Sequence, residues 1–298
     1  MNNIQEQISK LCNPNSRIDV KLIFDVQLGN PNGDPDNNGA PRIETSTGRG
    51  LVSDVCIKRK IRDYVNLRKQ GEEGYDIYVM NDSIPLERKH EEIVGTDIAK
   101  DKKKATVTSE ELMKRATTRF WDVRMFGGAM VVRPSIGSIR GPLQLSLFAS
   151  VDPVDSQEIT ITRCAPGKVS DNPEEQKGQE MGRKYMVPYA LFEGQITYNA
   201  PLGMKQGVTS EDLAVFWEAL LSMFEFDRAA GRGLMTVRKI VAFVHDSPLG
   251  TPYARAADLM DGVKAERVTD TDFPQSWEDY KINVNVDVPN GVTVVEIY

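Results

Sequence analysis

The feature that most constrains the fold of this chain is an alternation of apolar and polar side chains from Arg17 to Leu28. A repeat of two is the period of a β-strand with one buried face, so this stretch is predicted to be a strand. It should end at Asn30-Pro31-Asn32-Gly33, because proline removes a ladder donor and Asn-Gly accepts turn geometry. A helix with a basic stripe beside its apolar face is predicted over Leu51 to Lys69. The strand, the polar loop and the basic helix together favour the hypothesis that the chain binds a negatively charged polymer.

The remaining elements predict an α+β fold. Apolar alternation predicts further strands near residues 143–151, 158–163, 189–199 and 235–244. A helix is predicted from Thr108, which has capping-box spacing to Glu111, to Met125, and another across residues 213–224, capped by Thr209 or Ser210. With the Thr108 helix set aside, the order is strand, helix, strands, helix, strand. Two helices on one face of an antiparallel sheet is the ferredoxin-like plan of RNA-recognition domains.

Three segments depart from this plan. Residues 87–104 are charged, with few apolar anchors, and are predicted to be an insertion into a single RNA-recognition-like domain over residues 1–246, and residues 166–184 are predicted to be an exposed loop of that domain. Residues 247–298 are predicted to be an acidic C-terminal extension. Within it, the alternating stretches 281–288 and 292–297 flank Pro289-Asn290-Gly291 and predict a hairpin.

Composition excludes several classes of protein. Three widely spaced cysteines argue against a disulfide framework, and two histidines, His90 and His245, are too few for a histidine-based metal centre. No metal or cofactor is expected. No apolar run is long enough to span a bilayer and no signal peptide is evident at Met1, so a cytoplasmic protein with no membrane partner is expected.

The net charge of −6 conceals a local basic region. From Asp246 onward four basic residues face ten acidic ones, so that segment accounts for the whole imbalance. Between Ala40 and Lys69, eight basic residues face three acidic ones, which predicts contacts with phosphates. The candidates for these contacts are Arg42, Arg49, Lys58, Arg59 and Arg62. Weaker candidates elsewhere in the chain are Arg119, Arg124, Arg163, Arg183 and Lys184.

The loop from Asp34 to Gly39 allows other readings. It matches the opening of a calcium loop, but the twelfth position, where a bidentate glutamate is needed, is Thr45. Asp34 or Asp36 could instead serve a ribonuclease as catalytic acid or metal ligand. The third reading is a turn-rich contact surface whose side chains bond their own backbone. Gly231-Arg232-Gly233 could similarly let a nucleic-acid backbone approach closely, or could be a plain helix cap.

Eight blocks that occur in order carry a resemblance to a known family. They are NPNGDPD from Asn30, PRI from Pro41, GLVSDVCIKRKIRDYV from Gly50, RFWDVRMFG from Arg119, RGPLQLS from Arg140, TRC from Thr162, MGRKYMVPYALF from Met181 and LLSMFEFDRAAGRG from Leu220. With these blocks the chain resembles the Cas-seven backbone subunit of the type I-C CRISPR interference complex, Cascade. The residues after Asp246 carry no matching block.

The resemblance implies a non-catalytic subunit with a modified RNA-recognition palm, a finger insertion within residues 71–105 and a thumb-like loop within residues 166–184. Members stack head to tail along CRISPR RNA, hold its phosphates and present its bases to target DNA. The implied partners are CRISPR RNA, target DNA, further copies of the chain, the type I-C subunit that processes precursor RNA, and the large Cascade subunit. Two alternatives are a backbone endoribonuclease that uses Asp34 or Asp36, and a stand-alone RNA-binding module.

Overall fold

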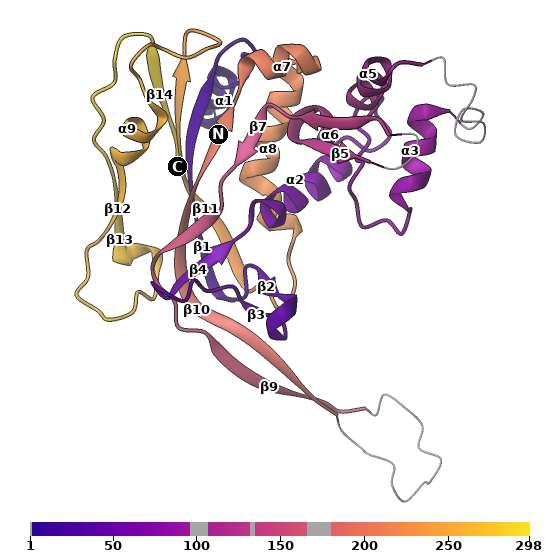
Figure 1. The fold of residues 1–298 in the computed structure, drawn as a ribbon. Helices are drawn as coiled ribbons and strands as arrows, with labels where there is room; N and C mark the ends of the chain where they lie inside the picture. Colours follow the sequence, from indigo (N-terminus) through magenta and orange to yellow (C-terminus); the bar gives the residue numbers. More distant parts are fainter. Residues whose placement is uncertain (1, 96–106, 132–134, 166–179) are drawn as a thin grey trace, which may run out of the picture.

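An antiparallel sheet forms the centre of the molecule (Figure 1). The computed structural model describes residues 2–95, 107–131, 135–165 and 180–298. Strand β1 (Ile18–Gly29) lies between β10 (Glu180–Tyr198) and β11 (Leu234–His245), and is antiparallel to both. The sheet order is β14-β11-β1-β10-β8-β4, and β7 and β9 also pair with β10. The outer strands are β4 (Arg49–Val52), β7 (Leu143–Leu145), β8 (Phe148–Pro153) and β14 (Val292–Ile297).

Two long helices cover one face of this sheet. They are α2 (Asp54–Arg68) and α8 (Ser210–Phe226), with α1 (Asn2–Lys10) beside α8 and α7 (Ala200–Gln206) before it. The alternate residues Ile18 to Val26 of β1 join the core beneath these helices, as the period of two predicts. The order β1, α2, β8, β10, α8, β11 follows the predicted strand, helix, strands, helix, strand plan of an α+β fold.

The C-terminal segment covers the opposite face of the sheet. It contains α9 (Ala256–Asp261), β12 (Val263–Arg267), the short helix η3 (Trp277–Asp279) and β13 (Tyr280–Val284). Ile23 of β1 and Leu191 of β10 are buried against Tyr280 from this segment. The Lys21 ammonium also donates a hydrogen bond to the Val263 carbonyl, 2.8 Å away.

The predicted C-terminal hairpin is wrong, because its two strands have different partners. Strand β13 pairs with β12, whereas β14 pairs with the edge of β11, from Val292 opposite His245 to Ile297 opposite Ile240. Val295 and Ile297 of β14 join the main core, which buries more apolar surface than an isolated hairpin could. Part of the segment predicted to be an appendage therefore completes the main sheet.

A second, smaller core lies beside α2. It draws on α3 (Leu86–Val94), α5 (Ser109–Arg119), α6 (Trp121–Phe126) and the paired strands β5 (Gly127–Met130) and β6 (Gly137–Arg140). Its buried residues run from Tyr78 to Ile139, so the described part of the predicted 71–105 insertion shares a core with residues beyond it. The predicted helix from Thr108 to Met125 is broken at Phe120, which has an extended backbone. We call residues 75–140 the side lobe.

A two-stranded arm extends from the sheet (Figure 1). Strand β9 (Gln157–Arg163) pairs with the first part of β10, and each of its residues is exposed. Residues 180–184, predicted to be loop, are strand because each has a ladder partner in β9. The rest of the predicted 166–184 insertion lies outside the described residues. No helix in the described ranges is long and apolar enough to cross a membrane.

Candidate nucleic-acid interface

The polar loop after β1 is fixed to the start of α2. Its short elements are β2 (Gly33–Asp34), the 3-10 helix η1 (Pro35–Asn37) and β3 (Ala40–Pro41). The Asn32 side-chain oxygen accepts hydrogen bonds from the Ser53 amide and hydroxyl groups, both at 2.9 Å. The Ser53 hydroxyl in turn accepts from the Cys56 amide at 3.2 Å, which caps α2. The loop is therefore held against the helix start.

A third segment, the turn between α8 and β11, meets the loop from the other side. The Asn30 amide donates to the Gly231 carbonyl at 2.9 Å. At Gly29 an added Cβ would lie 1.9 Å from the Arg232 carbonyl oxygen, so only glycine permits this approach. The close contact brings Arg232 next to the loop and to α2.

Three guanidinium groups from these three segments surround one side chain. Burial raises the pKa of the Cys56 thiol, while the positive charges of Arg232, Arg59 and Arg42 oppose that shift. Burial and then the charge of Arg59 lower the pKa of Arg232, which marks like-charge repulsion between the two. We call Arg42, Arg59 and Arg232 the arginine cluster. A bound anion would relieve this repulsion.

The arginine cluster retains capacity for a ligand. Arg59 is 54% exposed and its Nε lies 3.5 Å from Asp63, a long contact that solvent screens. An Arg42 terminal nitrogen lies 3.4 Å from Asp34, and the buried Nε of Arg42 has no hydrogen-bond partner among the described residues. Arg232 pairs with Asp227, which also pairs with Lys60.

The other predicted residues in this region differ in exposure. Arg49 on β4 is exposed and lies near Glu44, whose pKa is lowered mainly by the Ser46 and Thr47 hydroxyls and less by Arg49. Lys58 is half-buried, pairs with Asp54 at 2.9 Å and lies 5.7 Å from the Phe126 ring centre. Arg49 is thus open to a ligand, whereas Lys58 is largely committed to contacts within the protein.

Arg62 and Arg124 are not on this surface. Arg62 Nε donates to the buried Asp122 carboxylate at 2.8 Å, which also accepts from the Tyr78 and Val79 amides. Arg124 makes two hydrogen bonds to Asp212 at 2.7 and 3.1 Å. Both arginines are at least 90% buried, so a polyanion cannot reach them. They join the side lobe to the helices of the main domain.

The weaker candidates lie in two other places. Arg119 is on the side lobe and forms ion pairs with Asp76 at 2.9 Å and Glu92 at 2.6 Å. Arg163 and Arg183 are exposed on the arm, where Arg183 pairs with Glu158 at 3.2 Å. Lys184 donates a hydrogen bond to the Ala230 carbonyl, which connects the base of the arm to the turn that carries Arg232.

The acidic loop has a local role in the structure. One Asp34 oxygen accepts from the Asp36 amide at 3.3 Å and caps η1, while the same carboxylate pairs with Arg42. Within the described ranges, no group of three or more His, Cys, Asp or Glu side chains is placed to hold a metal ion. Asp34 therefore shapes the loop and partly neutralises the arginine cluster.

The comparison with known families adds an independent observation. A model of the family described as CRISPR-associated protein Cas7 matches residues 16–285. The chain belongs to this Cas7 family. The predicted resemblance is thus confirmed for the family, while the type I-C subtype stays a prediction.

Individual Cas7 relatives match less of the chain. A CRISPR-associated protein Cas7 from Haloferax volcanii is 31% identical over 122 residues, which are 39% of this chain and 32% of that protein. The chain therefore spans about a third of the length of this curated relative. A chain of a CRISPR RNA-guided surveillance complex, pre-nicking, is 15% identical with a TM-score of 0.47, covering 77% of this chain and 78% of that one. A second such surveillance-complex chain is 15% identical with a TM-score of 0.44, covering 77% and 69%.

Within this Cas7-family chain, Arg232 is the site residue that sequence reasoning did not select. Its glycine-flanked position signalled a close backbone approach, but nothing local indicated which segment it approaches. The contact with Gly29 and Asn30 depends on the antiparallel register of β1 and β11, which joins residues about 200 positions apart. That register could not be read from either segment alone.

Proposed function

We propose that this chain is a non-catalytic backbone subunit of a type I-C CRISPR interference complex. It oligomerises along CRISPR RNA, binds the RNA phosphates and presents the bases for pairing with target DNA. Family membership supports the assignment to a CRISPR system. The chemistry of the arginine cluster supports a polyanionic ligand.

The arginine cluster carries this proposal. Arg42, Arg59 and Arg232 come from three separate segments, their charges all act on Cys56, and Arg59 and Arg232 repel each other. Guanidinium groups present several donors in a plane that matches phosphate oxygens, which suits them to backbone contacts that do not depend on sequence. Arg49, exposed beside the same loop, extends the positive surface.

The partners follow from the same assignment. Further copies of the chain would stack head to tail, an association that forms a filament when its rotation does not close. The thumb-like role goes to the loop within residues 166–184, and the finger role to the insertion within residues 71–105. The subunit that processes precursor RNA and the large Cascade subunit would bind the assembled filament.

The test measures RNA binding by a variant in which two arginines of the cluster are replaced. Arg42→Ala combined with Arg59→Ala should weaken binding to a fluorescein-labelled single-stranded RNA ~10-fold or more, because each lost charge-assisted hydrogen bond contributes about 1.5–3 kcal/mol. Arg255→Ala is the matched control, since the Arg255 side chain is 76% exposed and forms an ion pair with Asp258. Equal affinities of the double variant and wild type would overturn the assignment of these residues.

Two further measurements separate the alternatives. Size-exclusion chromatography with a longer RNA should show complexes of several copies, and a single copy per RNA would favour a stand-alone binding module. Gel analysis of guide-paired RNA with Mg²⁺ should show intact strands. Cleavage that disappears in Asp34→Ala or Asp36→Ala would instead identify a ribonuclease.

A further inference from the structure

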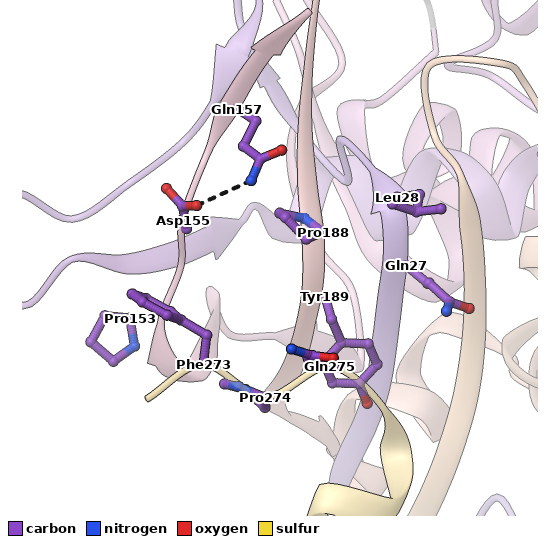
Figure 2. A pocket seen from close by; sticks show the side chains of 10 residues that line it. All are labelled: Gln27, Leu28, Pro153, Asp155, Gln157, Pro188, Tyr189, Phe273, Pro274 and Gln275. Atoms are coloured by element: carbon purple, nitrogen blue, oxygen red, sulfur yellow. Dashed lines mark hydrogen bonds between the residues drawn. The ribbon is translucent and has the colours of Figure 1, made fainter. Parts of the chain in front are cut away.

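A pocket of about 400 Å³ lies at the base of the arm, where the end of β1 meets β10 and the C-terminal segment. This size is within the range of small-molecule sites, about 300–1,000 Å³. Figure 2 shows the ring of Phe273 on one side of the pocket and Pro188 and Tyr189 on the other. Phe273 comes from the C-terminal segment, whereas Pro188 and Tyr189 belong to β10.

The chemistry of the pocket is that of a site for a neutral, flat ligand. Phe273 is 57% exposed, so its ring is free to stack against a ligand. The amide side chains of Gln27, Gln157 and Gln275 border the apolar walls. Asp155, the one charged residue of the lining, accepts a hydrogen bond from Gln157 (Figure 2). A phosphate finds no cation here, whereas a heteroaromatic ring with a polar edge finds both stacking and amide partners.

The pocket is continuous in sequence with the arginine cluster. Gln27 and Leu28 line the pocket, and the next residue, Gly29, lies directly against the backbone of Arg232. Leu28 has a φ of 51°, a left-handed conformation that non-glycine residues seldom adopt. β1 continues through Leu28 to Gly29, so the pocket lining and the backbone contact with Arg232 are adjacent along the strand. An RNA strand whose phosphates are held by the arginine cluster could place one of its bases in the pocket.

From this arrangement we propose that the pocket binds one nucleobase of the RNA whose phosphates the arginine cluster holds. The proposal rests on the function proposed above and adds a contact that the C-terminal segment makes. Phe273 stacks on the base, and the glutamine amides hydrogen-bond to its edge. Stacking accepts any base, so the site strengthens binding with little sequence preference.

The test compares a single-stranded RNA oligomer with a backbone-matched oligomer in which every base is replaced by an abasic unit. Phe273→Ala should weaken binding of the base-containing oligomer ~10-fold and leave binding of the abasic oligomer unchanged. Tyr253→Ala is the control, because Tyr253 is 99% exposed in the same segment and should affect neither oligomer. Gln157→Ala, at an exposed strand position, should give a smaller loss with the same selectivity for bases.

Each alternative result overturns a specific statement. If Phe273→Ala weakens both oligomers equally, or neither, the pocket does not bind a base. If a DNA oligomer of the same sequence shows the loss and the RNA does not, the assignment to RNA is wrong. If the wild type binds neither oligomer, the proposed function fails and the pocket proposal fails with it.

Discussion

Two sets of arginines in this protein have opposite roles. Arg62 and Arg124 are buried, and each meets a buried carboxylate. The charges of Arg42, Arg59 and Arg232 all act on Cys56, and the acidic neighbour of each arginine only partly neutralises it. The first set stabilises the fold, because each charge is matched within the protein. The second set is suited to a ligand, because its charge is not.

The difference does not lie in residue type or in local sequence. Arg59 and Arg62 are three positions apart on α2, yet one is largely exposed and the other is 8% exposed. The two arginines differ because Arg62 is paired with the Asp122 carboxylate, which lies 60 positions away along the chain. A basic stripe on a helix therefore identifies a functional surface only after the acidic residues that pack against it are known.

The largest expected effect is on stability. Arg124→Ala should destabilise the protein by ~3–5 kcal/mol, because the buried Asp212 carboxylate would lose its cationic partner. The carbonyls of Gly74 and Thr117 would also lose the Arg124 donors. Urea denaturation measures this loss. Arg115→Ala, which removes an exposed pair with Glu111, should change stability by ~0.5 kcal/mol or less.

That comparison fails if Arg124→Ala costs less than ~1 kcal/mol and instead weakens RNA binding. Such a result would place Arg124 in the second set of arginines. RNA affinity measured with folded Arg124→Ala protein at low temperature should match that of the wild type.

An intermediate effect is expected on the salt dependence of RNA binding. If Arg49 contacts one phosphate, Arg49→Ala should reduce the slope of log affinity against log salt by ~0.7, the value for one phosphate of a single strand. Its stability should stay within ~0.5 kcal/mol of the wild type, because Arg49 is exposed. Fluorescence anisotropy titrations at several salt concentrations measure the slope. An unchanged slope would mean that Arg49 does not contact RNA. Arg68→Ala is the matched control, because Arg68 is exposed and paired with Glu218.

The smallest effect concerns a buried carboxylate on the face covered by the C-terminal segment. Burial raises the pKa of Asp25 above its ordinary value of 3.8, although Arg238 and the Tyr189 hydroxyl oppose the shift. The folded protein therefore holds this proton more tightly than the unfolded chain. The stability that Asp25 contributes is present below pH 3.8 and is lost as the pH rises through the higher folded pKa.

Asp25→Asn should remove this pH dependence. Urea midpoints measured upward from about pH 4 should fall less steeply for Asp25→Asn than for the wild type, whatever their absolute difference. Asp258→Asn is an informative counterpart, since Arg255 lowers the pKa of Asp258 and the sign is reversed. Parallel wild-type and Asp25→Asn curves would contradict the raised pKa.

Local signals in the sequence predicted local structure well. Thr108 caps its helix as its spacing to Glu111 predicts, Thr209 is the cap among the two predicted candidates, and β1 has the predicted period of two. Both features depend on contacts within a few residues. The pairing of β14 was missed because Pro289-Asn290-Gly291 favours a local hairpin, while its competitor, the edge of β11, is distant in sequence.

The candidate site was predictable only in part. The segment from Ala40 to Arg59 supplied two residues of the arginine cluster from composition and helical period alone. The third, Arg232, depends on strand register, and the wrong inclusion of Arg62 and Arg124 came from carboxylates that no local pattern reveals. Long-range packing therefore determines which arginines form the proposed RNA-binding surface.

The position of β1 at the centre of the sheet has a consequence for how this chain is made. β1 (Ile18–Gly29) leaves the ribosome well before its two neighbours, β10 and β11, which begin only at Glu180 and Leu234. Until they emerge, an apolar strand with two unpaired edges stays exposed on the nascent chain, a state that invites aggregation. Pairing across such long sequence separations is also slow. Synthesis of this protein should therefore depend on molecular chaperones that shield β1 during translation.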